Sequence, residues 1–156
     1  MNGIVNSINI SSKGGVPKIP IEEGNILFHG LEGDFNKFRS SKMDGDLDRA
    51  ISLFSIEKIH QLQKEGHPIN VGSTGENLTL EGVDWVNLEQ GMRISIGDCI
   101  IQLSEPCAPC SKIGKSFNNR KFSRIDHNLE FGWSRWLARV LVEGKIAIGD
   151  SISILT

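Results

Sequence analysis

The sequence has no large excess of either charge and no long apolar stretch. Of its 156 residues, 17 are Lys or Arg and 19 are Asp or Glu, which gives a formal net charge of −2. General nucleic-acid binding usually comes with a marked basic bias, so the composition argues against it. No apolar run approaches the roughly 20 residues that span a bilayer. Residues 1–15 also lack the basic and apolar regions of a signal peptide. We therefore expect no nucleic-acid partner, no membrane span and no secretory leader.

Cysteine is also scarce, with three residues in the whole chain. An odd number of thiols, in a chain long enough to bury a core without disulfides, fits a reducing compartment. We therefore expect free thiols and a cytoplasmic location. The length and the 38% hydrophobic content fit one globular domain over residues 1–156.

Aromatic residues make up 6% of the chain, whereas glycine occurs 17 times and often separates short apolar runs. This pattern is typical of short strands joined by tight turns. RISIGDCIIQL (93–103) and KIAIGDSISIL (145–155) align without gaps, each with a Gly-Asp between two apolar runs. They are either related repeats or two ordinary strand–turn–strand units, and both interpretations favour β-structure. We predict a mainly β fold with one or two helices, closed or partly closed into a barrel.

Individual elements can be placed with differing clarity. The clearest helix is Ser55–Glu65, because Ser55 can cap it and apolar residues recur at helical spacing. Predicted strands and less regular segments complete the chain: strands at 3–10 and 50–54, weaker strands at 18–21 and 25–28, a long loop at 33–48, and a segment at 133–142 that we interpret as strand from Ala138 onward.

Cys107 and Cys110 form a C-x-x-C pair in SEPCAPCSK (104–112). A structural zinc site needs about four ligands, and no second pair of Cys or His residues is present. A thioredoxin-like pair opens a helix in a βαβ setting, whereas this context is β-rich. Two structural thiols remain possible, as does one reactive thiol. Lys112 and Lys115 favour the last interpretation, since a nearby cation stabilises the nucleophilic thiolate.

Two further segments contain candidate ligand-binding residues. GSTGENLT (72–79) has two glycines among small polar residues, and its backbone N–H groups could surround a phosphate or a heterocycle, although many such segments are simple turns. The acidic residues Asp44, Asp46 and Asp48 suggest calcium, but the glycine and glutamate of a calcium loop are missing. A solvated charged surface is the simpler interpretation there.

Taken together and in this order, several motifs resemble the MOSC family, named for the C-terminal domain of molybdenum cofactor sulfurases. They are GLEGD (30–34), DRAISL (48–53), GSTGENLTLEG (72–82), Pro109-Cys110 and RVLVEGKIAIGD (139–150). Each motif alone is weak, and their shared order over nearly the whole chain is more specific. The resemblance implies a MOSC-type β-barrel that binds the molybdenum cofactor (molybdopterin) and has a single functional cysteine.

By its position in the motif, that cysteine is Cys110. The resemblance implies that Cys110 is both the catalytic residue and the molybdenum ligand, and that Cys107 is a bystander. A thiolate is a soft ligand that suits molybdenum or the sulfur of a persulfide. The resemblance also suggests cofactor-binding residues. Arg49 and Lys112 are candidates for a phosphate, whereas Ser52, Glu76 and Asn77 would contact the ring or shape the pocket. Asp34, in the first motif, and the basic Arg135 complete the set of candidates.

Three functions remain open. In the first, the chain is a cofactor-binding module whose cysteine carries a persulfide from a cysteine desulfurase or delivers the cofactor to a molybdoenzyme partner. Alternatively, it is a small molybdoenzyme that reduces N-hydroxylated substrates, or a non-enzymatic β-barrel interaction protein. The chain contains no pyridoxal-phosphate desulfurase domain, so sulfur would have to come from another protein.

Overall fold

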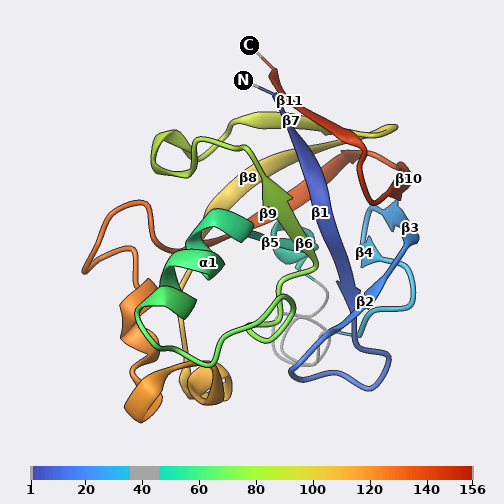
Figure 1. The fold of residues 1–156 in the computed structure, drawn as a ribbon. Helices are drawn as coiled ribbons and strands as arrows, with labels where there is room; N and C mark the ends of the chain where they lie inside the picture. The colour runs from blue at the N-terminus through green and yellow to red at the C-terminus, as the bar shows by residue number, and fades with distance from the viewer. Residues whose placement is uncertain (1, 36–45, 156) are drawn as a thin grey trace.

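The computed structural model describes residues 2–35 and 46–155. These residues form eleven strands, one α-helix and several short 3₁₀ helices; Figure 1 shows their arrangement. The strands are β1 (Asn2–Ile10), β2 (Ile19–Ile21), β3 (Glu23–Leu27), β4 (Gly30–Leu31), β5 (Ile51–Ser55), β6 (Leu78–Glu81), β7 (Arg93–Ile96), β8 (Cys99–Cys107), β9 (Arg135–Val142), β10 (Gly144–Ala147) and β11 (Ser151–Leu155). The helices are α1 (Ile56–Lys64) and the 3₁₀ turns η2 (Leu47–Arg49), η3 (Trp85–Asn87), η4 (Ser111–Ser116), η5 (Asn118–Arg120) and η6 (Phe122–Ile125).

Seven strands close into a barrel in the order β1-β11-β7-β8-β9-β5-β6, with β6 returning to β1. One edge of β1 is shared, because residues 2–4 pair with β11 and residues 8–10 pair with β2. The β5–β6 pair is parallel and is connected through α1, while the other pairs in the barrel are antiparallel. A second small sheet, in the order β10-β3-β4, lies beside the barrel. The predicted mainly β barrel is confirmed.

The α-helix forms as its sequence predicts. The Ser55 side-chain oxygen accepts a hydrogen bond from the backbone N–H of Lys58, which satisfies one of the donors left free in the first turn. Its apolar residues Ile56, Ile59 and Leu62 are buried in the core. Burial of this face against the barrel holds α1 in place, because a nine-residue helix is marginal in water by itself.

The two similar segments adopt different pairings. β7 and β8 form a hairpin whose Gly97 lies in the left-handed region that favours glycine. In the second segment β10 pairs with β3, and β11 pairs with β7 and β1. The Asp150 carboxylate accepts a hydrogen bond from the Ala147 N–H at 2.8 Å and so stabilises the turn between β10 and β11. The sequence similarity therefore marks two strand–turn–strand units that pair differently.

Several predicted boundaries need adjustment. The expected strand from Ala138 begins at Arg135, three residues earlier, where β9 pairs with the end of β8. Most of the predicted loop at 33–48 lies outside the described residues, as does Asp44, while residues 47–49 form the short helix η2. The connection from β8 to β9 contains three 3₁₀ turns that the sequence did not predict. None of the described helices has the length and apolar character needed to cross a membrane.

Candidate functional site

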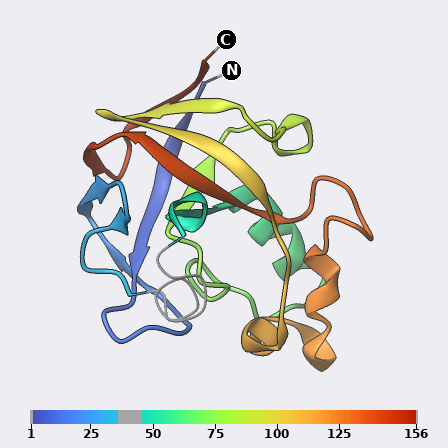
Figure 2. The same ribbon diagram turned by 180° about the vertical axis from the view of Figure 1, so that it is seen from behind.

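Arg135 joins two loops, one before β6 and one after β8. The segment that follows the second loop, coloured gold to orange, lies at the end of the barrel opposite the chain termini (Figures 1 and 2). Arg135 is the first residue of β9 and lies opposite Cys107 in the β8–β9 register. Its Nη1 donates to the carbonyl oxygen of Thr74 at 2.6 Å, and its Nη2 donates to that of Ala108 at 3.3 Å. The guanidinium therefore holds the loop at 72–77 against the loop that carries Cys110.

The same arginine has an unused donor. Arg135 is 7% exposed, and within the described residues its Nε has no hydrogen-bond partner. The hydroxyl of the adjacent Ser134, which is also buried, has none there either. Buried polar groups are normally hydrogen-bonded, so two neighbouring exceptions require an explanation. The Nε of Arg135 is therefore a candidate donor to an anionic or carbonyl group of a ligand.

Glu76 organises the loop at 72–77 from inside the protein. Its carboxylate accepts hydrogen bonds from the Gly72 N–H and from the hydroxyls of Thr74 and Thr79, at 2.9–3.1 Å. Burial raises the pKa of Glu76, whereas these hydrogen bonds oppose the rise because they stabilise the charged form. With its full set of internal partners and no exposed surface, Glu76 is placed to shape the loop rather than to contact a ligand.

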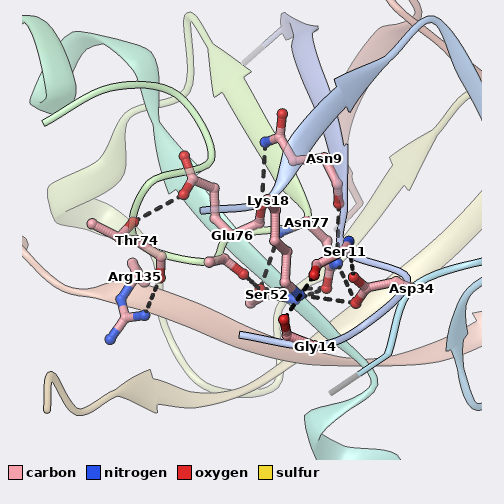
Figure 3. A network of polar contacts seen from close by, with 11 residues as sticks. Asn9, Ser11, Gly14, Lys18, Asp34, Ser52, Thr74, Glu76, Asn77 and Arg135 are labelled. Atoms are coloured by element: carbon pink, nitrogen blue, oxygen red, sulfur yellow. Dashed lines mark hydrogen bonds and ion pairs between the residues drawn. The ribbon is translucent and has the colours of Figure 1, made fainter. Parts of the chain in front are cut away.

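A second buried network connects this loop to the first strands (Figure 3). The Asn77 side chain donates to the Asp34 carboxylate at 2.9 Å and accepts from the Ser52 N–H at 3.1 Å. Asp34 also accepts from the Ser11 N–H and from the Lys18 ammonium, both at 2.8 Å. The side chains of Lys18 and Asp34 are only 6% and 1% exposed, so this ion pair is shielded from water.

Four of the predicted cofactor-binding residues therefore use their side chains within the protein. They are Asp34, Ser52, Glu76 and Asn77. Their hydrogen bonds fix the backbone of the 72–77 loop, which in turn positions Arg135. Lys18 belongs to the same network and was not predicted, because a lysine between Pro17 and Ile19 forms no recognisable motif.

The three cysteines have different surroundings. Cys99 is buried and donates to the carbonyl oxygen of Ile96 at 3.0 Å. Burial raises the pKa of its thiol to about 12, so it stays protonated at neutral pH. Cys107 is buried at the end of β8, whereas Cys110 is exposed. Only Cys110 presents its thiol to solvent.

The backbone also separates the two cysteines of the pair. Between Cys107 and Cys110 it contains neither a turn nor a bend, and Cys110 is extended, with φ −143° and ψ 172°. Three extended residues span about 10 Å, whereas a disulfide requires Cα atoms within roughly 7 Å. A Cys107–Cys110 disulfide would therefore require the loop to change shape. Among the described residues, no three or more His, Cys, Asp or Glu side chains form a group suited to a metal ion.

Arg49 and Lys112, the predicted phosphate ligands, lie on different elements. Arg49 ends η2 and pairs with Glu105 of β8 through a 3.1 Å contact. The hydroxyl of Ser104 donates to the carbonyl oxygen of Asp48 and attaches η2 to the same strand. Lys112 is exposed in η4, two residues after Cys110. Arg49 and Lys112 thus border the terminal part of β8 and the loop that follows it.

The connection from η4 to η6 is fixed to the 66–73 region and to α1. The Ser116 hydroxyl donates to that of Ser73 at 2.8 Å, and the Asn118 amide donates to the Gly66 carbonyl oxygen at 2.7 Å. Arg124 forms two hydrogen bonds with Glu65, at 2.8 and 2.9 Å. These contacts make the segment after Cys110 a defined part of the site, although its sequence lacks helical or strand periodicity.

The geometry defines a class of protein: a closed β-barrel with an exposed thiol and a buried arginine at one end. A family model described as the MOSC domain matches residues 40–153. The chain belongs to the MOSC domain family, as its motifs predicted.

Curated relatives include longer proteins. The chain is 25% identical to YflK of Bacillus subtilis over 144 residues, which cover 91% of this chain and 63% of YflK. It is 26% identical to YiiM of Escherichia coli over 131 residues, 81% of this chain and 57% of YiiM. A protein of Gibberella moniliformis named "Reductase" is 29% identical over 135 residues, 83% of this chain and 24% of that protein. The chain therefore spans less than two thirds of each of these relatives.

Solved structures support the fold. The YUAD protein from Bacillus subtilis superposes with a TM-score of 0.78 at 19% identity, over 97% of this chain and 94% of that one. YiiM from Geobacillus stearothermophilus gives a TM-score of 0.71 at 24% identity, over 100% of this chain and 76% of that one. At these identities the likeness establishes the shared barrel and not a shared activity.

Proposed function

We propose that this chain is a molybdenum-cofactor-binding module whose functional thiol is Cys110. The observation that carries the proposal is the pairing of an exposed cysteine with a buried arginine that keeps a free donor. Arg135 is hydrogen-bonded to the carbonyl oxygen of Ala108, two residues before Cys110, and its Nε is unpartnered within the described residues. A ligand that accepts from this Nε would lie beside the loop that presents the thiol.

The residues present fit such a cofactor. A thiolate suits a soft metal ion, and the phosphate of the cofactor suits a fixed guanidinium. Arg135 and Lys112 are the residues we assign to its anionic part, and Cys110 is the residue we assign to molybdenum. When bound, the cofactor would supply a metal centre that exchanges electrons and binds sulfur or oxygen. The buried network of Asp34 and Glu76 would keep the loop rigid before the ligand arrives, which reduces the entropy lost on binding.

For such a module, sulfur carriage or cofactor delivery is the role we favour. In the carrier reaction, the Cys110 thiolate attacks the terminal sulfur of a persulfide on a cysteine desulfurase. That sulfur moves to Cys110, and the desulfurase cysteine leaves as a thiolate with the electron pair. An exposed cysteine is necessary for this exchange, because both sulfur atoms must come into contact. The product would then serve a molybdoenzyme partner.

Reduction of N-hydroxylated compounds is the second candidate. It is favoured by the relative named "Reductase", of which this chain would correspond to about a quarter. In that case Cys110 would remain a metal ligand throughout the reaction, and electrons would come from another protein. The two roles make different demands on the thiol, which must be released from the metal while it accepts sulfur but stays bound to it throughout reduction.

Mass spectrometry and metal analysis of freshly purified protein test cofactor binding. We expect pterin and molybdenum in the wild type and in Cys107→Ala, and a loss of molybdenum in Cys110→Ala. Equal molybdenum in all three proteins would contradict the role of Cys110 as ligand, and one equivalent of zinc would overturn the assignment.

Two assays separate the roles. A persulfide trapped on Cys110 after incubation with a desulfurase and cysteine supports sulfur carriage. Turnover of benzamidoxime by cofactor-loaded protein with an artificial electron donor supports the reductase, provided that Cys107→Ala retains it and Cys110→Ala does not. If neither occurs, a non-enzymatic interaction protein is the better description.

A further inference from the structure

Positive charge is concentrated in the segment that contains Cys110. Five of the 17 lysines and arginines, and none of the 19 aspartates and glutamates, lie within residues 106–125. The rest of the chain therefore holds 12 basic and 19 acidic residues, a formal charge of −7 against +5 for this basic segment. The chain as a whole is slightly acidic, so the local excess does not follow from overall composition.

Most of this charge is free to act on an approaching molecule. Arg124 is used within the protein, in ion pairs with Glu65 and Glu130. The other four basic residues are exposed, and none forms an ion pair within the described residues: Lys112, Lys115, Arg120 and Lys121. Uncompensated charges of one sign, close together, set up a field that extends about 10 Å at ordinary salt.

The position of Arg120 brings this charge to the backbone next to Cys110. Its Nη2 donates to the carbonyl oxygen of Ser111, the residue after Cys110, at 3.0 Å. The guanidinium lies over Gly114, where a Cβ would come within 2.8 Å of it. Asn119 and Arg120 both have positive φ, at 53° and 56°. This conformation is uncommon for residues other than glycine. The backbone therefore adopts a strained shape that turns a cation back towards Cys110.

The basic segment is also held rigidly, through the contacts of Ser116 with Ser73 and of Asn118 with Gly66. A fixed charged surface loses little entropy on association, and complementary charge accelerates encounter. We infer that the basic segment 106–125 is a docking surface for an acidic protein partner that must reach Cys110. The inference rests on the proposed function in taking Cys110 as the functional thiol, and it adds the kind of surface that meets it.

A protein, rather than a small anion, is the occupant we infer, because the four unpaired cations are spread over residues 112–121, from η4 to the residue after η5. Lys112 and Lys115 lie on η4, Arg120 ends η5 and Lys121 follows it, and η4 contacts both η5 and η6. A single carboxylate or phosphate needs one or two cations around a pocket. Two cavities in the described residues lie elsewhere, one lined by residues of the 10–21 segment and the other beside β10.

Thiol exchange with short synthetic peptides tests the inference without the cofactor. Each peptide carries one cysteine as a mixed disulfide with thionitrobenzoate, flanked either by glutamates or by lysines. The Cys110 thiolate attacks the peptide sulfur, the sulfur–sulfur bond breaks, and thionitrobenzoate leaves with the electron pair and absorbs visible light. At about 20 mM salt we expect the acidic peptide to react at least about tenfold faster than the basic one. At about 1 M salt the two rates should converge.

Charge reversal supplies the matched control. The variant K112E/K121E should remove the preference for the acidic peptide, whereas R93E/K145E, with the same net charge at exposed positions on β7 and β10, should keep it. Gly114→Ala, which displaces the end of the flexible Arg120 side chain, should weaken the preference in a folded protein, as judged by circular dichroism.

Three results would overturn the docking surface. These are equal rates for the two peptides at low salt, a preference that persists at high salt, and equal effects of the two charge-reversed variants. A fourth concerns size: if a mixed disulfide with a single small carboxylate depends on Lys112 and Lys121 as strongly as the acidic peptide does, the cations serve a small anion. If the exchange rate is unchanged in Cys110→Ala, Cys110 is not the reacting thiol, and this result would contradict the proposed function instead.

Discussion

The buried ion pair between Lys18 and Asp34 offers a sharp test of what holds the site together. The two side chains meet at 2.8 Å, and water reaches almost none of either. Lys18→Met keeps most of the side-chain volume and removes the charge. The Asp34 carboxylate then keeps two donors, the Ser11 N–H and the Asn77 amide, but loses its cation. Breaking a buried pair in this way costs about 3–5 kcal/mol.

The remaining donors lower the expected cost to the bottom of that range, about 3 kcal/mol. Lys145 provides the matched control, because it pairs with Glu23 at 3.7 Å with both side chains about 60% exposed. Lys145→Met should cost less than about 1 kcal/mol, as exposed pairs do. Urea unfolding at neutral pH, with a common slope for all variants, measures both free energies of unfolding.

A double-mutant cycle separates the pair from the general effect of losing a lysine. Asp34→Asn keeps the shape of the carboxylate and removes its charge. Combined with Lys18→Met, it should cost clearly less than the sum of the single changes, since no unpaired charge is left buried. Additive free energies, or equal costs for Lys18→Met and Lys145→Met, would refute the view that this pair braces the 72–77 loop.

Two further predictions concern titration and thiol reactivity. The hydrogen bond from Arg124 lowers the pKa of Glu65 from 4.5 to about 2, so the pair stabilises the protein above pH 4.5, and this contribution is lost as pH falls towards 2. Urea unfolding at neutral and acidic pH should therefore show a smaller acid loss in Glu65→Gln than in the wild type, and an equal loss would contradict this account. Iodoacetamide should alkylate Cys110 in the native protein and reach Cys99 only after unfolding, because Cys99 is buried and burial raises the pKa of its thiol to about 12. Mass spectrometry of the peptides measures labelling at both sites, and labelling of Cys99 in the native protein would contradict this expectation.

The fold could be predicted where local chemistry and packing agree. Ser55 and three apolar residues at helical spacing define α1, and the structure contains it within one residue of the expected bounds. β1 was also expected within one residue, because its β-branched apolar residues are followed by the polar, glycine-containing turn at 11–15. The start of β9 was misplaced since Trp133–Val142 suits a helix as well as a strand, and only pairing with β8 decides between them.

The site could be predicted only in part, because its contacts depend on the closed barrel. Arg135 was a candidate as a basic residue, but its two carbonyl partners lie 61 and 27 residues away in the sequence. Arg120 was missed, since neither its positive φ nor its contact with Ser111 leaves a local signal. The roles predicted for Cys110 as catalytic residue and metal ligand remain predictions that the proposed experiments address.

The shared edge of β1 has a consequence for how this barrel connects to other sequence. Asn2 lies opposite Ser153 and Ile4 opposite Ser151, so the chain enters and leaves the barrel at neighbouring points. That seam lies at the end opposite the cysteine loop, as both ribbon views show (Figures 1 and 2). The barrel is therefore built so that flanking sequence on either side, or insertion into a longer chain, would meet it at one place without approaching the thiol. A circular permutant that joins the two ends through a short flexible linker and opens between β3 and β4 should keep the Arg135 contacts.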